Sequence, residues 1–129
     1  MLGGTYALRS MAQPGKAYVG HPIWGDDPQP ATMDDYWDLP NTDEGDYGGV
    51  HINSGIPNYA FYIAAMEAGG FAWETVGKVW YAAWTESLDH KADFRQARNA
   101  TIAQAARLFG KGSKVHKAVQ KGWRAAKVK

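Results

Sequence analysis

The sequence predicts an all-α fold, in which a small array of about four helices follows a long, irregular, loop-rich segment. From residue 54 onwards, apolar residues recur at three- and four-residue spacing in four successive stretches. Before residue 50, the chain carries five of its six prolines and eight of its thirteen acidic residues, a composition typical of loops. We therefore expect one domain over residues 1–129, with a loop-rich segment at 1–50 and a helical part at 51–129.

The composition favours a packed globule. Hydrophobic residues make up 45% of the chain and aromatic residues 13%. No apolar run approaches the roughly 20 residues that a membrane span needs, so we expect no membrane partner. The first residues, Met-Leu-Gly-Gly-Thr, lack the basic and apolar regions of a signal peptide. The absence of cysteine excludes disulfides and thiolate zinc sites but leaves the compartment open.

The first two helices are expected at residues 54–67 and 72–88. Asn53 or Ser54 is the expected N-cap of the first, and Gly69 and Gly70 end it. The second carries an apolar stripe that we interpret as core. Its members are Trp73, Val76, Val79, Trp80, Ala83, Trp84 and Leu88.

The last two helices also have capping signals. Asp93 is the expected N-cap of the third, which Gly110 ends, and Ser113 is the expected N-cap of the fourth. The inward face of the fourth helix is predicted to consist of Val115, Val119, Trp123 and Ala126. Short connections between such helices are typical of a small bundle or orthogonal array.

The net charge of +1 conceals an asymmetry along the chain. Residues 1–90 contain three basic and twelve acidic residues, whereas residues 91–129 contain eleven basic residues and Asp93 alone. We interpret the basic end as the solvated faces of the last helices. The alternative is a nucleic-acid-binding surface. Its candidate residues are Lys111, Lys114, Lys117, Lys121 and Arg124.

The most informative stretch is Asp46-Tyr47-Gly48-Gly49-Val50-His51. Two adjacent glycines allow a tight turn, and we expect His51 on this constrained loop just before the first helix. A carboxylate five residues earlier orients the imidazole and keeps it protonated near neutral pH. A protonated histidine stabilises an oxyanion, although a lone His near an Asp is more often structural.

Other polar residues of the loops allow two interpretations. By residue type alone, Arg9 is an ordinary surface arginine, or its guanidinium clamps a peptide carbonyl or a carboxylate. His21, Asp26 and Asp27 form a makeshift metal site, or they belong to a self-satisfied surface loop, which we favour.

Two segments resemble the thermolysin-like neutral zinc metalloproteases. The stretch from Asp46 through His51 to Ile56 is similar to the histidine segment of that family, and residues 7–11, Ala-Leu-Arg-Ser-Met, are similar to its arginine segment. The resemblance implies that His51 and Asp46 are the catalytic transition-state histidine and its orienting aspartate. It implies that Arg9 binds a substrate carbonyl and that Leu8 lines an adjoining apolar pocket, with residues 1–50 along the cleft. Tyr47 departs from the family, which commonly has asparagine at that position.

The resemblance covers only the C-terminal domain of such an enzyme. The family binds zinc through His-Glu-x-x-His and a later glutamate, and none of the four histidines here is followed by glutamate. We expect no metal in this chain, with zinc, and calcium as a second candidate, belonging to the full-length enzyme. The isolated chain should be inactive or nearly so.

The resemblance also implies partners. These are a peptide or protein substrate, the missing zinc-bearing N-terminal half, and a second copy of the chain, bound through the apolar surface that the missing half leaves open. By family analogy the protein is secreted, with a cytoplasmic location as the alternative. The alternative function is a stand-alone peptide-binding module without catalysis.

Overall fold

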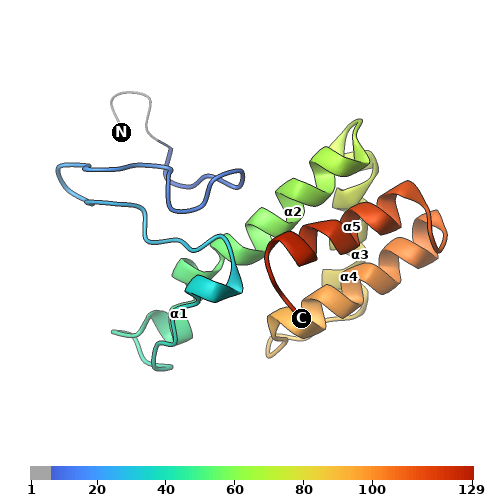
Figure 1. Ribbon diagram of the computed structural model, residues 1–129. Helices are drawn as coiled ribbons and strands as arrows, with labels where there is room; N and C mark the ends of the chain where they lie inside the picture. Colours follow the sequence, from blue (N-terminus) through green and yellow to red (C-terminus); the bar gives the residue numbers. More distant parts are fainter. Residues whose placement is uncertain (1–6) are drawn as a thin grey trace. The chain divides into compact units, whose positions relative to one another are not determined.

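The computed structural model describes residues 7–129, and it is all-α, as predicted (Figure 1). Four longer helices follow the loop-rich segment: α2 (Gly55–Ala68), α3 (Val76–Glu86), α4 (Phe94–Phe109) and α5 (Lys114–Ala125). A short helix, α1 (Asp46–Asn53), precedes them, and two 3₁₀ turns lie at Met33–Asp35 (η1) and Ala72–Glu74 (η2). No strand occurs in the described part, which has a single isolated bridge between His21 and Gly25.

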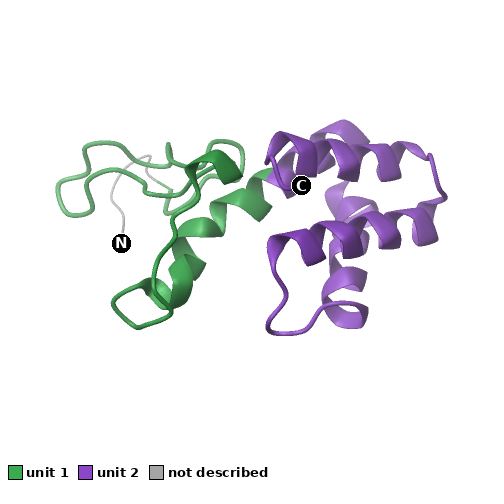
Figure 2. Ribbon diagram, turned by 60° about the horizontal axis from the view of Figure 1, so that its bottom comes forward, with its two compact units in different colours: residues 1–59 green, residues 60–129 purple. Residues whose placement is uncertain are grey.

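The chain divides into two compact units, residues 1–59 and residues 60–129 (Figure 2). The boundary falls within α2. The first unit holds the loops and α1, and the second holds the rest of α2 with α3, α4 and α5.

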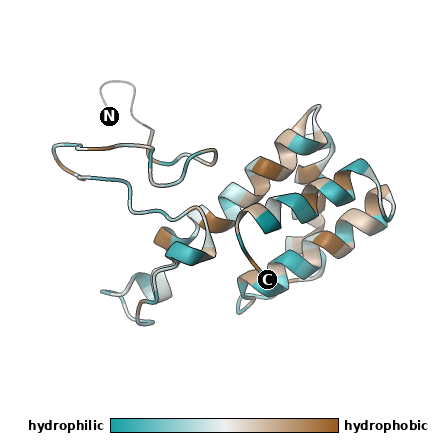
Figure 3. Ribbon diagram, viewed as in Figure 1, coloured by the Kyte–Doolittle hydropathy of each residue, from teal (hydrophilic) through white to brown (hydrophobic). Residues whose placement is uncertain are grey.

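In residues 60–129, α4 packs against both α3 and α5. Hydrophobic and hydrophilic bands alternate along these helices, as expected of amphipathic helices (Figure 3). The fully buried Trp123 of α5 stacks on Trp80 of α3, with ring centroids 5.9 Å apart, and its Nε1 donates to Thr101 Oγ1 of α4 at 2.7 Å. One tryptophan thus connects three helices and keeps its polar atom hydrogen-bonded.

A glycine brings α5 close to α2. A Cβ atom added at Gly122 would lie 2.2 Å from the carbonyl oxygen of Ala60 and 3.1 Å from the Cβ of Ala64. Only glycine fits this crossing, because any side chain would force the helices apart.

The predicted caps of the last two helices are confirmed. Asp93 accepts the Gln96 N–H at 2.7 Å, and the Gln96 side chain accepts the Asp93 N–H at 2.9 Å, which completes a capping box. Ser113 Oγ accepts the His116 N–H at 3.1 Å. The predicted inward face of α5 is confirmed as well, since all four of its residues are buried.

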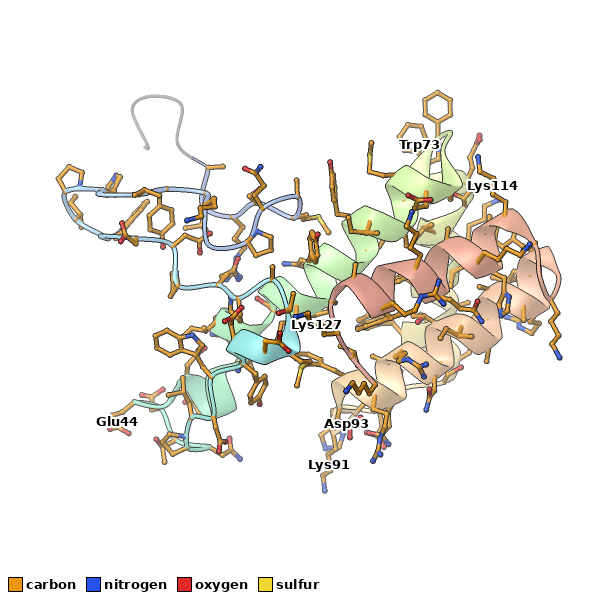
Figure 4. The ribbon with its side chains drawn as sticks, viewed as in Figure 1. Glu44, Trp73, Lys91, Asp93, Lys114 and Lys127 are labelled. Atoms are coloured by element: carbon orange, nitrogen blue, oxygen red, sulfur yellow. The ribbon has the colours of Figure 1, made fainter. Side chains whose placement is uncertain are left out.

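The expected core stripe of the second helix is partly wrong. Val76, Val79 and Ala83 are buried, but Trp73 is 67% exposed and Trp84 50% exposed. The predicted helix also starts too early, because Trp73 lies in η2, before α3 begins at Val76. Its ring stacks on that of Phe71 at 4.5 Å and projects from the outer edge of its unit (Figure 4).

Candidate functional site

Four consecutive residues with left-handed backbone conformation lead to His51. Their φ angles are 53° at Asp46, 49° at Tyr47, 81° at Gly48 and 75° at Gly49. A single helical turn follows and ends at Asn53, so His51 lies on this turn and not on a loop, contrary to the expectation. The sequence signal was misread because the two glycines form a tight turn whose continuation is helical.

Ser54 stands directly before α2, and its carbonyl accepts the Asn58 N–H at 3.2 Å, as expected of an N-cap residue, but the side chains of Asn53 and Ser54 make other contacts. The buried Asn53 carboxamide accepts the Trp37 N–H at 3.0 Å and donates to the Trp37 carbonyl at 2.9 Å. Ser54 Oγ donates to the His51 carbonyl at 2.8 Å. Asn53 therefore joins the helical turn to the loop around Trp37, with the geometry of a strand-like pair of hydrogen bonds.

Asp46 holds both the ring and the backbone of His51. Its Oδ1 lies 2.5 Å from His51 Nδ1, and its Oδ2 accepts the main-chain N–H groups of His51 at 2.8 Å and Ile52 at 3.1 Å. These hydrogen bonds, that to the His51 side chain foremost, hold the pKa of the Asp46 carboxyl below its usual value. Because an ionised carboxylate only accepts, Nδ1 carries a proton and Nε2 is the atom left for a ligand. The His51 side chain is 72% exposed.

Arg9 reaches the same segment from 42 residues away. Its Nη1 donates to the His51 carbonyl at 3.0 Å and to Ser54 Oγ at 2.8 Å. No residue between 7 and 129 accepts a hydrogen bond from its Nε or Nη2, so the Nε–Nη2 edge of the guanidinium is available. This edge has the fork geometry that binds a carbonyl or carboxylate with two parallel hydrogen bonds.

A pocket of about 140 Å³ adjoins these groups. Its lining includes Leu8, Arg9, Tyr18, Gln29, His51 and Ile52. The structure thus places three predicted site residues, Leu8, Arg9 and His51, on one pocket, while Asp46 stands behind the ring of His51. For comparison, a cavity of about 150 Å³ holds one benzene molecule, so the pocket suits a single medium-sized apolar side chain.

Sequence reasoning missed Gln29. It named Asp27 only together with His21 and Asp26, and it did not predict which groups Asp27 binds. Asp27 is buried and accepts the N–H groups of Gly15, Ala17 and Gln29 at 2.9, 3.2 and 3.1 Å. The Gln29 side chain donates to the His51 carbonyl at 2.8 Å and to Ser54 Oγ at 2.9 Å. The available signal was a polar residue enclosed by Pro28 and Pro30, which restrict the backbone on both sides.

The polar loop residues bind their own backbone. Asp26 accepts the Gly20 N–H at 2.7 Å, and His21 Nδ1 accepts the N–H groups of Ile23 and Trp24, each at 3.3 Å. Within residues 7–129, no three or more His, Cys, Asp or Glu side chains gather in a way that would hold a metal ion. These residues therefore do not fit the zinc of the thermolysin-like enzymes.

Tyr47 occupies a strained position beside the catalytic candidates. Its φ of 49° is uncommon for a residue with a bulky side chain. A hydrogen bond to Asp43 raises the pKa of its phenol above the usual value. The side chain is exposed, so its bulk stands on the surface of the turn.

The described residues thus form an all-α chain in which a carboxylate-bound histidine and an arginine adjoin one pocket. Residues 2–128 match the family described as "Thermolysin metallopeptidase, alpha-helical domain", and the chain belongs to this family. It is therefore a domain of the thermolysin-like zinc metalloprotease class, as the resemblance predicted.

Individual relatives agree with this assignment. The chain is 43% identical over 123 residues to Protease PrtS of Photorhabdus sp. (strain Az29), covering 95% of this chain and 32% of that protein. It is 46% identical over 117 residues to an extracellular metalloprotease of Pectobacterium carotovorum subsp. carotovorum, covering 90% and 32%. The solved structure of the precursor of protealysin, a metalloproteinase from Serratia proteamaculans, superposes with a TM-score of 0.86 at 45% identity, covering 98% of this chain and 38% of that one. The chain spans about a third of the length of these relatives.

None of the helices in the described part of the chain is both long and apolar enough to cross a membrane.

Proposed function

We propose that this chain is the substrate-side, transition-state-stabilising domain of a zinc metalloendopeptidase. The observation that carries the proposal is the meeting of Arg9 and His51 at one pocket, each with an unused hydrogen-bonding edge. Peptide-bond hydrolysis builds negative charge on the former carbonyl oxygen, and preorganised donors aimed at that charge stabilise it.

His51 and Asp46 are the proposed catalytic pair. With Nδ1–H engaged by Asp46, the ring donates from Nε2 only when it is protonated. In that form His51 supplies one donor to the oxyanion, and the exposure of its side chain leaves Nε2 accessible. Asp46 orients the imidazole through Nδ1 and also accepts the main-chain N–H of His51, so one carboxylate fixes both the ring and the backbone of this residue.

Arg9 and Leu8 are the proposed substrate-binding residues. The Nε–Nη2 edge of Arg9 is suited to a main-chain carbonyl of a bound peptide. Leu8, which is 60% exposed, adds an apolar wall to the pocket. A peptide with an apolar side chain is therefore the proposed ligand.

The chain alone is proposed to bind peptides without cleaving them, because the described residues do not fit zinc, the ion that would polarise the carbonyl and activate the attacking water. The proposed partner is a zinc-bearing half, because the relatives named metalloproteases are about three times as long as the part that this chain matches. In that assembly residues 1–129 act as one domain, with residues 1–50 along the cleft and residues 51–129 as the helical part. Secretion is proposed from the relative that is named an extracellular metalloprotease.

A peptide titration monitored by NMR tests this proposal. The ¹⁵N-labelled chain is titrated with the blocked dipeptide acetyl-Leu-Ala-amide and, separately, incubated with the same peptide and zinc. We expect saturable shifts at residues 8, 9 and 51, no cleavage, and an affinity that falls at least about tenfold in Arg9→Ala. Arg95→Ala, at an exposed arginine of α4, is the matched control and should bind normally. Shifts elsewhere only, or zinc-dependent cleavage by the isolated chain, would contradict the proposal.

Self-association of the isolated chain is a second proposal. The second unit exposes Phe71, Trp73, Tyr81 and Trp84, and a groove of about 570 Å³ is lined by Trp73, Tyr81 and Leu108, among others. Large exposed apolar surfaces favour association with a second copy. Light scattering at micromolar concentration should therefore give at least twice the mass of 14.2 kDa, and a monomer would contradict the proposal.

A further inference from the structure

Gln29 and Arg9 donate hydrogen bonds to the same two acceptors. Arg9 Nη1 reaches the His51 carbonyl at 3.0 Å and Ser54 Oγ at 2.8 Å, and Gln29 Nε2 reaches them at 2.8 and 2.9 Å. Ser54 Oγ in turn donates to the His51 carbonyl at 2.8 Å. Two N–H₂ groups from distant parts of the chain are therefore fixed side by side on one pair of oxygens.

The orientation of the Gln29 carboxamide follows from chemistry. A main-chain carbonyl only accepts hydrogen bonds, so the group that faces His51 O must be the Nε2 donor and not Oε1. Oε1 then points away from both acceptors. Among residues 7–129, it is the one buried side-chain oxygen or nitrogen atom that lacks a hydrogen-bond partner.

The backbone around Gln29 is rigid. Pro28 and Pro30 enclose it, and its N–H donates to Asp27 Oδ1 at 3.1 Å. Asp27 Oδ2 also accepts from Gly15 and Ala17, which ties the residue to a second stretch of loop. The Gln29 side chain is thus a fixed, buried donor, whereas Arg9 is exposed.

We propose that Gln29 is a positioning residue for Arg9: by occupying the shared acceptors it sets the orientation of the guanidinium and leaves the Nε–Nη2 edge for the peptide. The unpaired Oε1 supports this, because an unsatisfied buried acceptor destabilises the fold, and an apolar side chain of the same shape would remove it. Gln29 therefore stabilises the fold little, and its donor end serves the arginine. The peptide part of this inference rests on the proposed function.

The first test needs no ligand. In the wild-type chain, NMR of the Arg9 guanidinium should give separate signals for its N–H₂ groups, because hydrogen bonds hinder their rotation. In Gln29→Met these signals should shift, because the guanidinium takes another orientation on the acceptors it no longer shares, while the melting temperature stays within a few degrees of wild type. Gln104→Met, which also replaces a buried, hydrogen-bonded glutamine but in the other unit, should leave the Arg9 signals unchanged.

Arg9 signals that are unchanged in Gln29→Met would overturn the proposal. Should Gln29→Met fail to fold, Gln29→Glu gives the same readout, because it puts a carboxylate oxygen against the His51 carbonyl and draws the guanidinium towards itself. Unchanged Arg9 signals in Gln29→Glu would overturn the proposal equally.

The second test is a double-mutant cycle with acetyl-Leu-Ala-amide. Gln29→Met should weaken binding about fivefold in the wild-type background and have no further effect in Arg9→Ala, since Gln29 acts through Arg9. An equal loss in both backgrounds would show direct action of Gln29 on the peptide and would overturn the positioning role. If the wild-type chain binds no peptide, the proposed function fails, while the guanidinium signals still decide the role of Gln29.

Discussion

Arg9 binds the main-chain carbonyl of His51, at 3.0 Å from Nη1, and not its imidazole. The arginine therefore fixes the backbone on which the histidine stands without occupying a ring nitrogen. Asp46 takes Nδ1, and Nε2 remains available among the described residues. The guanidinium of Arg9 and the imidazole of His51 thus keep separate ligand-facing edges.

Replacing Arg9 by lysine should lower peptide affinity although the charge is kept. An ammonium group donates from a single point, so it cannot bridge the His51 carbonyl and Ser54 Oγ while it also presents a second, planar edge to a ligand. We expect Arg9→Lys to weaken binding of acetyl-Leu-Ala-amide about tenfold, measured by NMR titration. If Arg9→Lys bound the peptide with wild-type affinity, the positive charge alone, and not the planar edge, would account for binding.

The stability of the turn at residues 46–52 should fall in acid. The pKa of the Asp46 carboxyl is lowered in the folded state, so its stabilising contribution is present above the ordinary pKa of 3.8 and is lost as the pH falls through the lower folded value. Amide hydrogen exchange of His51 and Ile52, followed from pH 5 down to about pH 2, should show this loss of protection in the wild type. In Asp46→Asn the protection should be lower at pH 5 and nearly independent of pH. If Asp46→Asn lost protection in acid as the wild type does, the pH dependence would come from another group.

Local signals predicted the starts of the last two helices, whereas the site required contacts that spacing does not contain. Asp93 and Ser113 cap helices through residues three positions away, and such pairs are readable in the sequence. Arg9 and His51 meet across 42 residues, and the sequence alone suggested this only through resemblance to a family. The place of Gln29 between two prolines is visible in the sequence, but its role is not, because its partners are a main-chain carbonyl and a hydroxyl of another segment.

The exposed tryptophans of the second unit have a different explanation. Helical spacing identifies an apolar stripe, but it does not say how much of that stripe a neighbouring helix covers. Val76, Val79 and Ala83 are covered, while Trp84, on the same helix, is half exposed. A stripe rich in aromatic residues is wider than the surface that the adjoining helices bury.

The two glycines of the turn should differ in their tolerance of alanine. Both have positive φ, so a methyl group at either position costs about 1–2 kcal/mol of backbone strain. At Gly49 the added Cβ would also lie 2.6 Å from Asn53 Nδ2, whereas at Gly48 the nearest atom is 4.0 Å away. We expect Gly49→Ala to disrupt the bonds between Asn53 and Trp37, seen as loss of amide protection at Trp37, and Gly48→Ala to preserve them. Equal losses of protection at Trp37 in the two variants would mean that backbone strain alone, and not the contact with Asn53, determines the effect of the methyl group.

Tyr47 should be replaceable by asparagine with a gain in stability. Its φ of 49° is unfavourable for tyrosine, and asparagine tolerates the left-handed region better than most residues. Loss of the hydrogen bond to Asp43, an exposed contact, offsets only part of the gain. Tyr47→Asn should therefore stabilise the turn by roughly 0.5–1 kcal/mol, measured by hydrogen exchange at residues 46–52. A loss of stability would mean that the phenol contributes more than the backbone strain costs.

The hydrogen bond between Trp123 and Thr101 should make Thr101→Val markedly destabilising. Valine has nearly the shape of threonine, but it leaves the fully buried Trp123 Nε1–H without an acceptor, at a cost of about 1–3 kcal/mol. Thr101 Oγ1 donates to the carbonyl of Ala97, four residues earlier, at 2.8 Å. Thr85→Val is the matched control, because Thr85 donates in the same way to the carbonyl of Tyr81 but is exposed and accepts from no tryptophan. Thermal unfolding followed by tryptophan fluorescence should give a clear fall in melting temperature for Thr101→Val and a shift equivalent to less than about 0.5 kcal/mol for Thr85→Val. Similar values for the two variants would mean that water or a rearranged side chain satisfies the indole, and that the core of the second unit does not depend on this bond.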